Sequence, residues 1–215
     1  MYKQLRIRAY LRSGVISDQY LPLDGILYYQ LVREKMGEQI LTRPGESNIR
    51  EGTGLYLPLK LAGDRDDGTW FYNCSFAQWS DDMIEDDSFK VKKLDFVEYK
   101  NYLNENRVVY SSRGKFKAYH IKVYYRISSY VEWYCIGNVV EIAKLLKFCT
   151  HIGKNSGDGW GEIRKWEIVD WQEDWSIRGP GNKLMRAVPW RKSNCSYGLR
   201  PSYWNERHIF PCKMP

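Results

Sequence analysis

The sequence predicts an α+β fold with a βαββαβ core, a pattern typical of ferredoxin-like (RRM-like) domains. Three observations indicate it. An alternating strand precedes a helix near the N-terminus, and a second strand–helix–strand unit lies between residues 115 and 171. The two halves are separated by short strand candidates and a charged stretch. A glycine-rich loop before the last strand and a basic C-terminal extension complete the predicted architecture.

The first half begins with a strand and a helix. Residues 5–11 alternate between an apolar face and a basic, aromatic face containing Arg6 and Arg8, as in a half-buried strand. Residues 23–36 form the predicted helix, which Gly37 ends. One helix face carries a stripe of three leucines, and the strand has four apolar positions. These apolar residues are Leu5, Ile7, Ala9, Leu11, Leu23, Leu27 and Leu31.

The middle of the chain gives weaker signals. Residues 38–53 contain turn signals, and residues 55–61 and 69–77 are short strand candidates. The charged, poorly periodic stretch 80–106 is interpreted as an insertion. The acids at 81–87 allow a metal hypothesis, but a solvated loop is favoured, because no histidine or second carboxylate cluster has matching spacing. No metal is therefore expected.

The second half starts with a long strand, predicted over residues 115–127, followed by a strand over 131–136. A helix then begins at Asn138, a good N-cap with Glu141 three positions later, and Gly153 is its predicted stop. The last strand covers 163–171. Its predicted apolar face is Ile163, Val169 and Trp171. Trp166 and Ile168 lie opposite, so both faces are expected to be partly covered. In the long strand, the faces are Tyr119, Ile121, Val123, Tyr125 and Ile127 against His120, Lys122, Tyr124 and Arg126.

Four glycines occupy the nine-residue loop 153–161, between the helix and the last strand. Rossmann and P-loop sites have the opposite order, in which a strand feeds the loop and a helix follows. Asp158 after Gly157 excludes a Walker A motif, and the G-x-G-x-G spacing is not a dinucleotide fingerprint, so no cofactor is expected. Exposed N–H groups in such a loop can bind an anion, and a tight turn is the alternative.

Net charge is concentrated at the C-terminus. The chain carries +7, and the segment from Ser176 onward has eight Lys or Arg residues and one Glu, so it accounts for +7 while the rest is neutral. Aromatic residues are interleaved with these cations. This composition favours contact with nucleic acid over a merely solvated basic tail.

The remaining composition is that of a soluble protein. No apolar run has the length of a membrane span, and the N-terminus lacks the apolar core of a signal peptide, so we expect a cytoplasmic protein. The five scattered cysteines predict reduced thiols and give zinc little support. Residues 1–172 are predicted to form one domain with an insertion around 64–112, and 173–215 an extension.

Four segments together resemble a known family. They are LPLDGIL at 21–27, the helix–loop–strand run 145–168, DWSI at 174–177, and LRPSYWNERHIFPCKMP at 199–215. A ferredoxin-like unit with this glycine loop resembles the RAMP superfamily of CRISPR-associated RNA-binding proteins. Within it, the segments resemble the Cas-five-like subunit of type IV effector complexes. The resemblance covers most of the chain and is weakest over 80–110.

The resemblance implies a non-catalytic subunit that caps the 5′ handle of the guide RNA. It also implies docking on the backbone and large subunits, near entering target DNA. The loop departs from the common form, which has more basic residues than Asn155, Ser156 and Asp158. This weakens the case for phosphate contacts by side chains but not by backbone N–H groups. Trp160 is expected either to stack on a base or to anchor the loop. We expect RNA contacts from Arg6, Arg8, Lys115, Lys117, His120, Lys122, Arg126, Gly153, Lys154, Asn155, Ser156, Gly157, Gly159, Trp160, Arg164, Arg186, Arg191 and Lys192.

The alternative function is a metal-independent endoribonuclease that processes CRISPR repeat RNA. Such chemistry needs a general base and a general acid. His120 is the candidate, with Tyr119 and Lys122 beside it, and a structural or stacking role for His120 is favoured. His151 lies at the predicted end of a helix, where a cation interacts favourably with the helix dipole, so its presence does not require a catalytic role. His208 lies in the tail. A scaffold without a nucleic-acid role explains the basic tail poorly.

Overall fold

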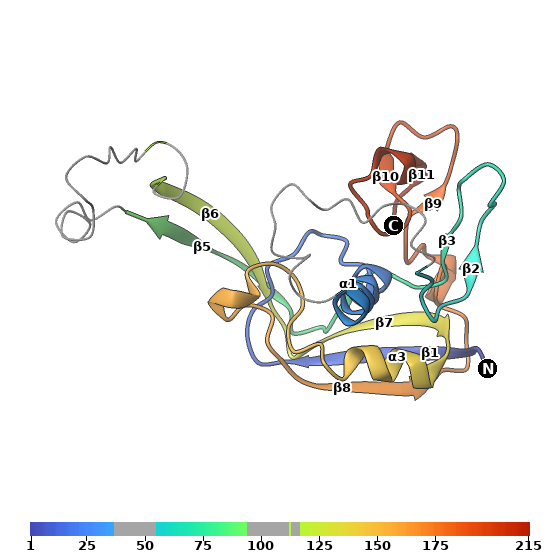
Figure 1. The fold of residues 1–215 in the computed structure, drawn as a ribbon, viewed down its shortest axis with the longest axis horizontal. Coiled ribbons are helices and arrows are strands. Elements are labelled where there is room, and N and C mark those ends of the chain that lie inside the picture. The colour runs from blue at the N-terminus through green and yellow to red at the C-terminus, as the bar shows by residue number, and fades with distance from the viewer. Residues whose placement is uncertain (37–54, 94–111, 113–116) are drawn as a thin grey trace.

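The structure is a computed structural model that describes residues 1–36, 55–93, 112 and 117–215. It is a mixed α/β fold with several antiparallel sheets and few helices (Figure 1). The predicted loop 38–53, Gly37 and Lys115 lie outside the described residues. The central sheet has four strands in the order β4-β7-β1-β8. Their bounds are Gln78–Trp79 for β4, Tyr130–Gly137 for β7, Lys3–Leu11 for β1 and Ile163–Asp170 for β8.

Two helices cover one face of this sheet (Figure 1), α1 over Leu23–Met36 and α3 over Val139–Leu146. Both were predicted, and Asn138 caps α3 as expected, since its side chain accepts from the N–H groups of Val140 and Glu141. The helix ends before Gly153, which lies further along the loop. The core contains the predicted apolar positions of β1 and α1: Leu5, Ile7, Ala9, Leu23, Leu27 and Leu31.

Of the apolar face predicted for β8, only Ile163 packs against the core, and the rest of that face was assigned wrongly. Trp166 pairs with Ala9, and Ile168 pairs with Ile7, so both lie on the core side. Val169 pairs with Arg6 on the outer face, and Trp171 lies beyond the strand. The reason is the register against β1, because a shift of one residue moves every side chain to the other face.

A two-stranded hairpin projects from the body (Figure 1). It consists of β5, Ile84–Lys92, and β6, Tyr119–Ile127, which pair antiparallel along their full lengths. The part of the charged stretch predicted as a solvated loop is therefore a strand. The predicted apolar face of β6 is not buried: Ile121 is 54% exposed and Ile127 is 47% exposed. Both faces meet solvent because the ribbon extends past the sheet.

The C-terminal segment folds onto the body. Three strands in the order β10-β11-β9 form a small sheet, over Ser196–Gly198, Ile209–Lys213 and Val188–Pro189. Short strands β2, Leu61–Ala62, and β3, Phe71–Tyr72, replace the longer ones predicted nearby. A second core joins Phe71 and Phe76 to Ala187, Leu199 and Cys212. The described residues also form three short 3-10 helices: η3 over Ser156–Asp158, η4 over Pro180–Asn182 and η5 over Glu206–His208.

All five cysteines are free thiols. Within the described ranges, no group of His, Cys, Asp or Glu is arranged to hold a metal ion. No helix among the same residues is long and apolar enough to cross a membrane.

Candidate nucleic-acid interface

Two of the loop glycines are required by the fold. Gly153 and Gly161 have φ of +81° and +71°, which side chains rarely adopt. A Cβ at Gly153 would collide with the carbonyl oxygen of Ile16, and one at Gly161 with that of Ile152. These positions let the loop pass close to neighbouring backbone.

Gly157 and Gly159 face open space. Among the described residues, no heavy atom lies within 4 Å of a Cβ added at either position. Gly159 has φ of +86°, so its backbone still favours glycine. Gly157 has neither a positive φ nor a close neighbour in the part of the chain that the structure describes. Packing among these residues therefore does not explain why residue 157 lacks a side chain.

The loop rests against the hairpin. The Trp160 ring lies 4.6 Å from the Tyr125 ring of β6, between centroids, and is partly buried. Asp158 forms an ion pair with Lys90 of β5, and the Ser13 hydroxyl donates to the Gly159 carbonyl at 2.8 Å. Of the two expectations for Trp160, these contacts favour anchoring.

The start of the loop is polar and exposed. The Lys154 ammonium lies 2.8 Å from the Asp18 carboxylate, and both side chains are mostly exposed. Asn155 takes a left-handed conformation with φ of 60°, and Ser156 begins the 3-10 helix η3. The cation of the loop is thus already paired with a carboxylate of the same chain.

A groove of about 440 Å³ lies beside the loop. It is formed by three segments that are far apart in sequence: the LPLDG region, the loop start, and the C-terminal segment at Tyr203. The LPLDG and tail motifs carried the family resemblance, but sequence reasoning did not bring them together. The lining residues used below are Ser17, Tyr20, Tyr29, Gln30, His151 and Tyr203.

A buried polar cluster holds these segments together. The Asp24 carboxyl group is fully buried, receives hydrogen bonds from the Tyr203 hydroxyl and the Gly25 N–H, and lies 3.8 Å from the Arg186 guanidinium. Burial raises the pKa of Asp24, against the opposing effects of Arg186 and Tyr203. The LPLDG motif and the tail are therefore one structural unit.

Arg186 is a correction to the predicted RNA contacts. Its side chain is 1% exposed, and its N–H groups donate to the carbonyls of Tyr72, Cys74 and Leu199. A buried guanidinium needs this pairing, since an unpaired buried charge is very costly. Its cation joins the tail to the body and offers no surface to a polyanion.

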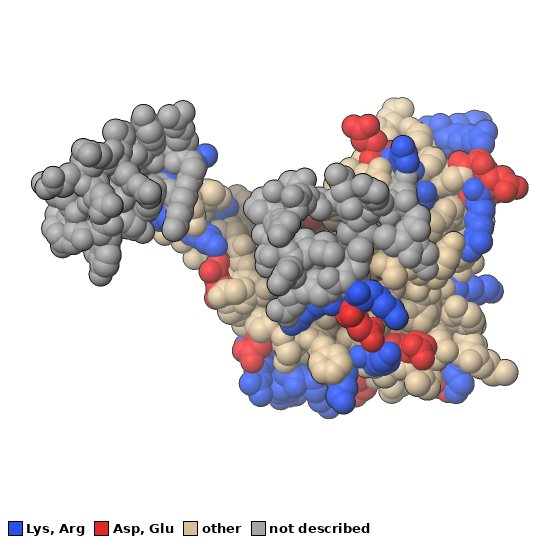
Figure 2. Space-filling model, in the orientation of Figure 1, with Lys and Arg blue, Asp and Glu red and all other residues tan. Residues whose placement is uncertain are grey.

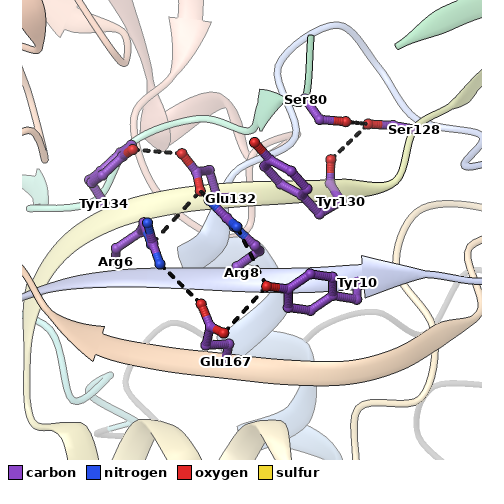
Figure 3. Close-up of polar contacts among 9 residues, drawn as sticks. All are labelled: Arg6, Arg8, Tyr10, Ser80, Ser128, Tyr130, Glu132, Tyr134 and Glu167. Atoms are coloured by element: carbon purple, nitrogen blue, oxygen red, sulfur yellow. Dashed lines mark hydrogen bonds and ion pairs between the residues drawn. The ribbon is translucent and has the colours of Figure 1, made fainter. Parts of the chain in front are cut away.

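Arg6 and Arg8 lie on the outer face of the central sheet, away from the helices (Figure 3). Arg6 lies 3.0 Å from Glu167, and Arg8 lies 2.7 Å from Glu132 and stacks 3.8 Å from the centroid of the Tyr130 ring. Their positive charges are balanced within the protein, so a phosphate would have to displace these carboxylates.

Lys122, Tyr124 and Arg126 belong to the basic, aromatic face that was predicted for the strand over residues 115–127. Those residues lie on the hairpin, in a different sheet. Lys122 is 3.1 Å from Asp87, and Arg126 is 2.8 Å from Glu85. The predicted basic, aromatic surface is therefore divided between two sheets.

The nuclease candidates are only partly gathered. His120 stacks on Phe89 with ring centroids 4.6 Å apart, and Lys122 lies on the same face of the hairpin. Tyr119 points to the other face, because successive strand residues alternate. His151 is partly exposed in the loop after α3, and His208 is buried beside the Ser202 carbonyl.

The remaining predicted cations are exposed. Arg191 has an 89% exposed side chain 3.4 Å from Asp67, and Lys192 is exposed beside it. Arg164 lies over the Tyr10 ring at 5.6 Å, and Lys117 is exposed just before β6. Figure 2 shows Lys and Arg gathered beside the C-terminal sheet at upper right and near the start of β8 at lower left.

Comparisons with known proteins match a family model over nearly the whole chain. A family model described as "CRISPR type IV associated protein Csf3" matches residues 3–215. No curated protein matches. A chain in the cryo-EM structure of the Type III-B Cmr-beta bound to cognate target RNA is similar at 12% identity and a TM-score of 0.39. The match covers 79% of this chain and 61% of that chain, so this chain spans less than two thirds of its length.

Proposed function

The chain belongs to the Csf3 family of type IV CRISPR-associated proteins, and from this premise we propose that it is a guide-RNA-binding, non-catalytic subunit of a type IV effector complex. In this proposal it caps the 5′ handle of the guide RNA. The observation that carries the proposal is the open backbone at Gly157, where packing among the described residues does not require glycine. A missing side chain lets an RNA backbone approach the loop closely.

We also propose that the core is ferredoxin-like. Read from the other edge, the central sheet runs β8-β1-β7-β4, with antiparallel neighbours. The helix α1 follows β1, and α3 connects β7 to β8. This arrangement supports two split βαβ units, each with a helix on the same sheet face.

We assign each proposed partner to a segment of the chain that is exposed to solvent. The handle lies along the open side of the glycine loop, where Gly157, Gly159 and Ser156 are exposed. The exposed tail cations Arg191 and Lys192 contact RNA, target DNA or a neighbouring subunit. The projecting hairpin is available to the backbone and large subunits of the complex.

Substitution at Gly157 tests whether RNA binds against the open backbone of the loop. Gly157→Leu adds a side chain into open space, so its melting temperature stays that of the wild type. The same side chain blocks close approach of RNA, and the Kd for single-stranded RNA carrying the 5′ handle rises about tenfold or more. Fluorescence anisotropy and thermal unfolding measure the two effects. Gly161→Ala is the matched control, because its Cβ collides with Ile152, and it loses stability first.

Wild-type RNA affinity in a folded Gly157→Leu variant contradicts RNA binding against this open backbone. That result would leave the loop as a connection only.

Incubation of the protein with repeat RNA in EDTA distinguishes a non-catalytic RNA-binding subunit from a metal-independent nuclease. We expect intact RNA, with equal results for the wild type and His120→Ala, because His120 stacks on Phe89 and Tyr119 faces away from it. Cleavage by the wild type that disappears in His120→Ala, with binding retained, shows that the chain is an enzyme.

A further inference from the structure

We propose that the groove beside the glycine loop receives a single unpaired base of the bound RNA. This inference rests on the proposed function and assigns a second contact site to it. The groove is adjacent to the loop, since three loop residues, Gly153, Lys154 and Ser156, line it. An RNA strand that passes the open side of the loop therefore reaches the groove without leaving the protein surface.

The size of the groove suits one nucleotide. Its volume of about 440 Å³ lies at the lower end of the range for small-ligand pockets, about 300–1,000 Å³. RNA-binding proteins commonly splay out an unstacked base, stack it on an aromatic ring and contact its polar edge. The groove supplies both of these elements.

Three tyrosines provide the aromatic surface. Tyr203 is fixed by its hydrogen bond to buried Asp24, and Tyr20 is supported by Phe76 and Tyr197, with ring centroids 5.1 and 6.0 Å away. Tyr29 projects from α1 and is 49% exposed. Two rings are thus held rigidly before binding, which lowers the entropic cost of binding. The third, Tyr29, is accessible for stacking.

Polar groups line the same groove. The Ser17 hydroxyl is buried and, among the described residues, has no hydrogen-bond partner. Buried polar atoms are nearly always paired, so this hydroxyl lacks a partner that a ligand can supply. His151 and the Gln30 amide add donors and acceptors. Such groups match the hydrogen-bonding edge of a base better than an apolar peptide side chain.

The test combines base removal with ring removal. The probes are single-stranded RNAs carrying the 5′ handle, each with one abasic position, and the proteins are the full chain and Tyr29→Ala. We expect Tyr29→Ala to weaken binding of intact RNA about 5- to 100-fold, the range for loss of one stacked base. We also expect one abasic position that weakens the wild type similarly but has no further effect in Tyr29→Ala.

Two variants serve as controls. Tyr29→Phe keeps the ring and retains both wild-type affinity and sensitivity to that abasic position. Tyr56→Ala removes a ring that is 65% exposed and outside the groove. Its effect on the Kd should therefore be the same for intact RNA and for each abasic RNA.

The outcomes are distinguishable. If the wild type binds the handle RNA but no abasic position is coupled to Tyr29, the groove inference is wrong and the proposed function stands. If Tyr29→Ala keeps its RNA affinity but detaches a neighbouring subunit from the complex, the groove is a protein-docking site and the inference is again wrong. If the wild type binds no handle RNA, the proposed function itself fails, and the inference fails with it.

Discussion

Single residues in the glycine loop perform different tasks that sequence alone cannot separate. The sequence predicted the loop, its position after α3 and the exclusion of nucleotide cofactors. It could not show that Gly161 is fixed by the Ile152 carbonyl while Gly157 faces open space, because that distinction depends on non-local backbone. The same limitation explains Arg186. A basic residue in a basic tail is expected to be exposed, and the sequence does not show which distant groups bury it and pair with its charge.

The Asp18–Lys154 pair gives a prediction at this scale. Asp18→Asn removes an acid from the rim of the loop and releases the Lys154 ammonium for a phosphate. We expect RNA affinity to rise about two- to fivefold at low salt, in keeping with the modest energy of an exposed pair. Anisotropy titrations at two salt concentrations measure it. An unchanged or weaker affinity in Asp18→Asn means that Lys154 does not contact RNA.

The buried Asp24 carboxyl group predicts a pH dependence of stability. Its pKa is raised in the folded state, so the folded protein binds this proton more tightly than the unfolded chain does. The contribution of Asp24 is therefore greatest below the ordinary value of 3.8 and declines as pH rises through the higher, folded-state pKa. Urea unfolding across this window should show the free energy of unfolding of the wild type falling relative to Asp24→Asn.

The paired comparison cancels the titration of other carboxyl groups. A difference between the two proteins that is constant, or that changes in favour of the wild type as pH rises, contradicts the raised pKa.

The helices α1 and α3 were predicted from different signals. The leucine stripe indicated α1, although this helix is only weakly amphipathic, and α3 was predicted from strong apolar periodicity and its N-cap. The outer position of Val169 in β8 and the existence of β5 were not predicted, for different reasons. In β8 both faces carry large apolar residues, so only the register with β1 decides which is buried. In β5 the acidic stretch has no apolar alternation, because the ribbon has no core to face.

The contact between hairpin and loop gives a prediction at the element scale. Trp160→Ala removes the ring that packs on Tyr125. The Asp158–Lys90 ion pair and the hydrogen bond from Ser13 to the Gly159 carbonyl remain. We expect faster amide exchange across residues 154–160 and a loss of about 1–2 kcal/mol in the free energy of unfolding. Hydrogen-exchange mass spectrometry measures the first effect. Trp190→Ala, at a ring that is 53% exposed, is the control. Equal exchange in wild type and Trp160→Ala shows that the ring does not restrain the loop.

The whole molecule has an uneven distribution of usable charge. Two of the eight tail cations are buried, Arg186 and Arg200, and the outer face of the sheet is neutralised by Glu132 and Glu167. The net charge of the tail was the main sequence signal for nucleic-acid binding, and it overstates the positive charge that a polyanion meets. Exposed cations such as Arg191 and Lys192 remain.

Salt dependence tests this whole-molecule picture. RNA binding should weaken steeply with salt, because phosphate contacts release counterions. Replacing both Arg191 and Lys192 with Gln should reduce the slope of log K against log salt by about one for each phosphate that is no longer neutralised. Lys144→Gln, on α3 and paired with Glu34, is the control. A slope near zero for the wild type contradicts the polyanion proposal, and an unchanged slope in the double variant places the contacts elsewhere.

The hydrogen bond between Tyr203 and Asp24 joins residues 179 positions apart. During synthesis, α1 is made long before Arg186 and Tyr203 are available. Until then, Asp24 lacks both of these buried partners, and the groove lacks one wall. Contacts between such distant residues slow folding, because the chain must close a long loop before it can form them. The groove is therefore completed only after Tyr203 has been synthesised, and a chain truncated before this residue lacks one of its walls.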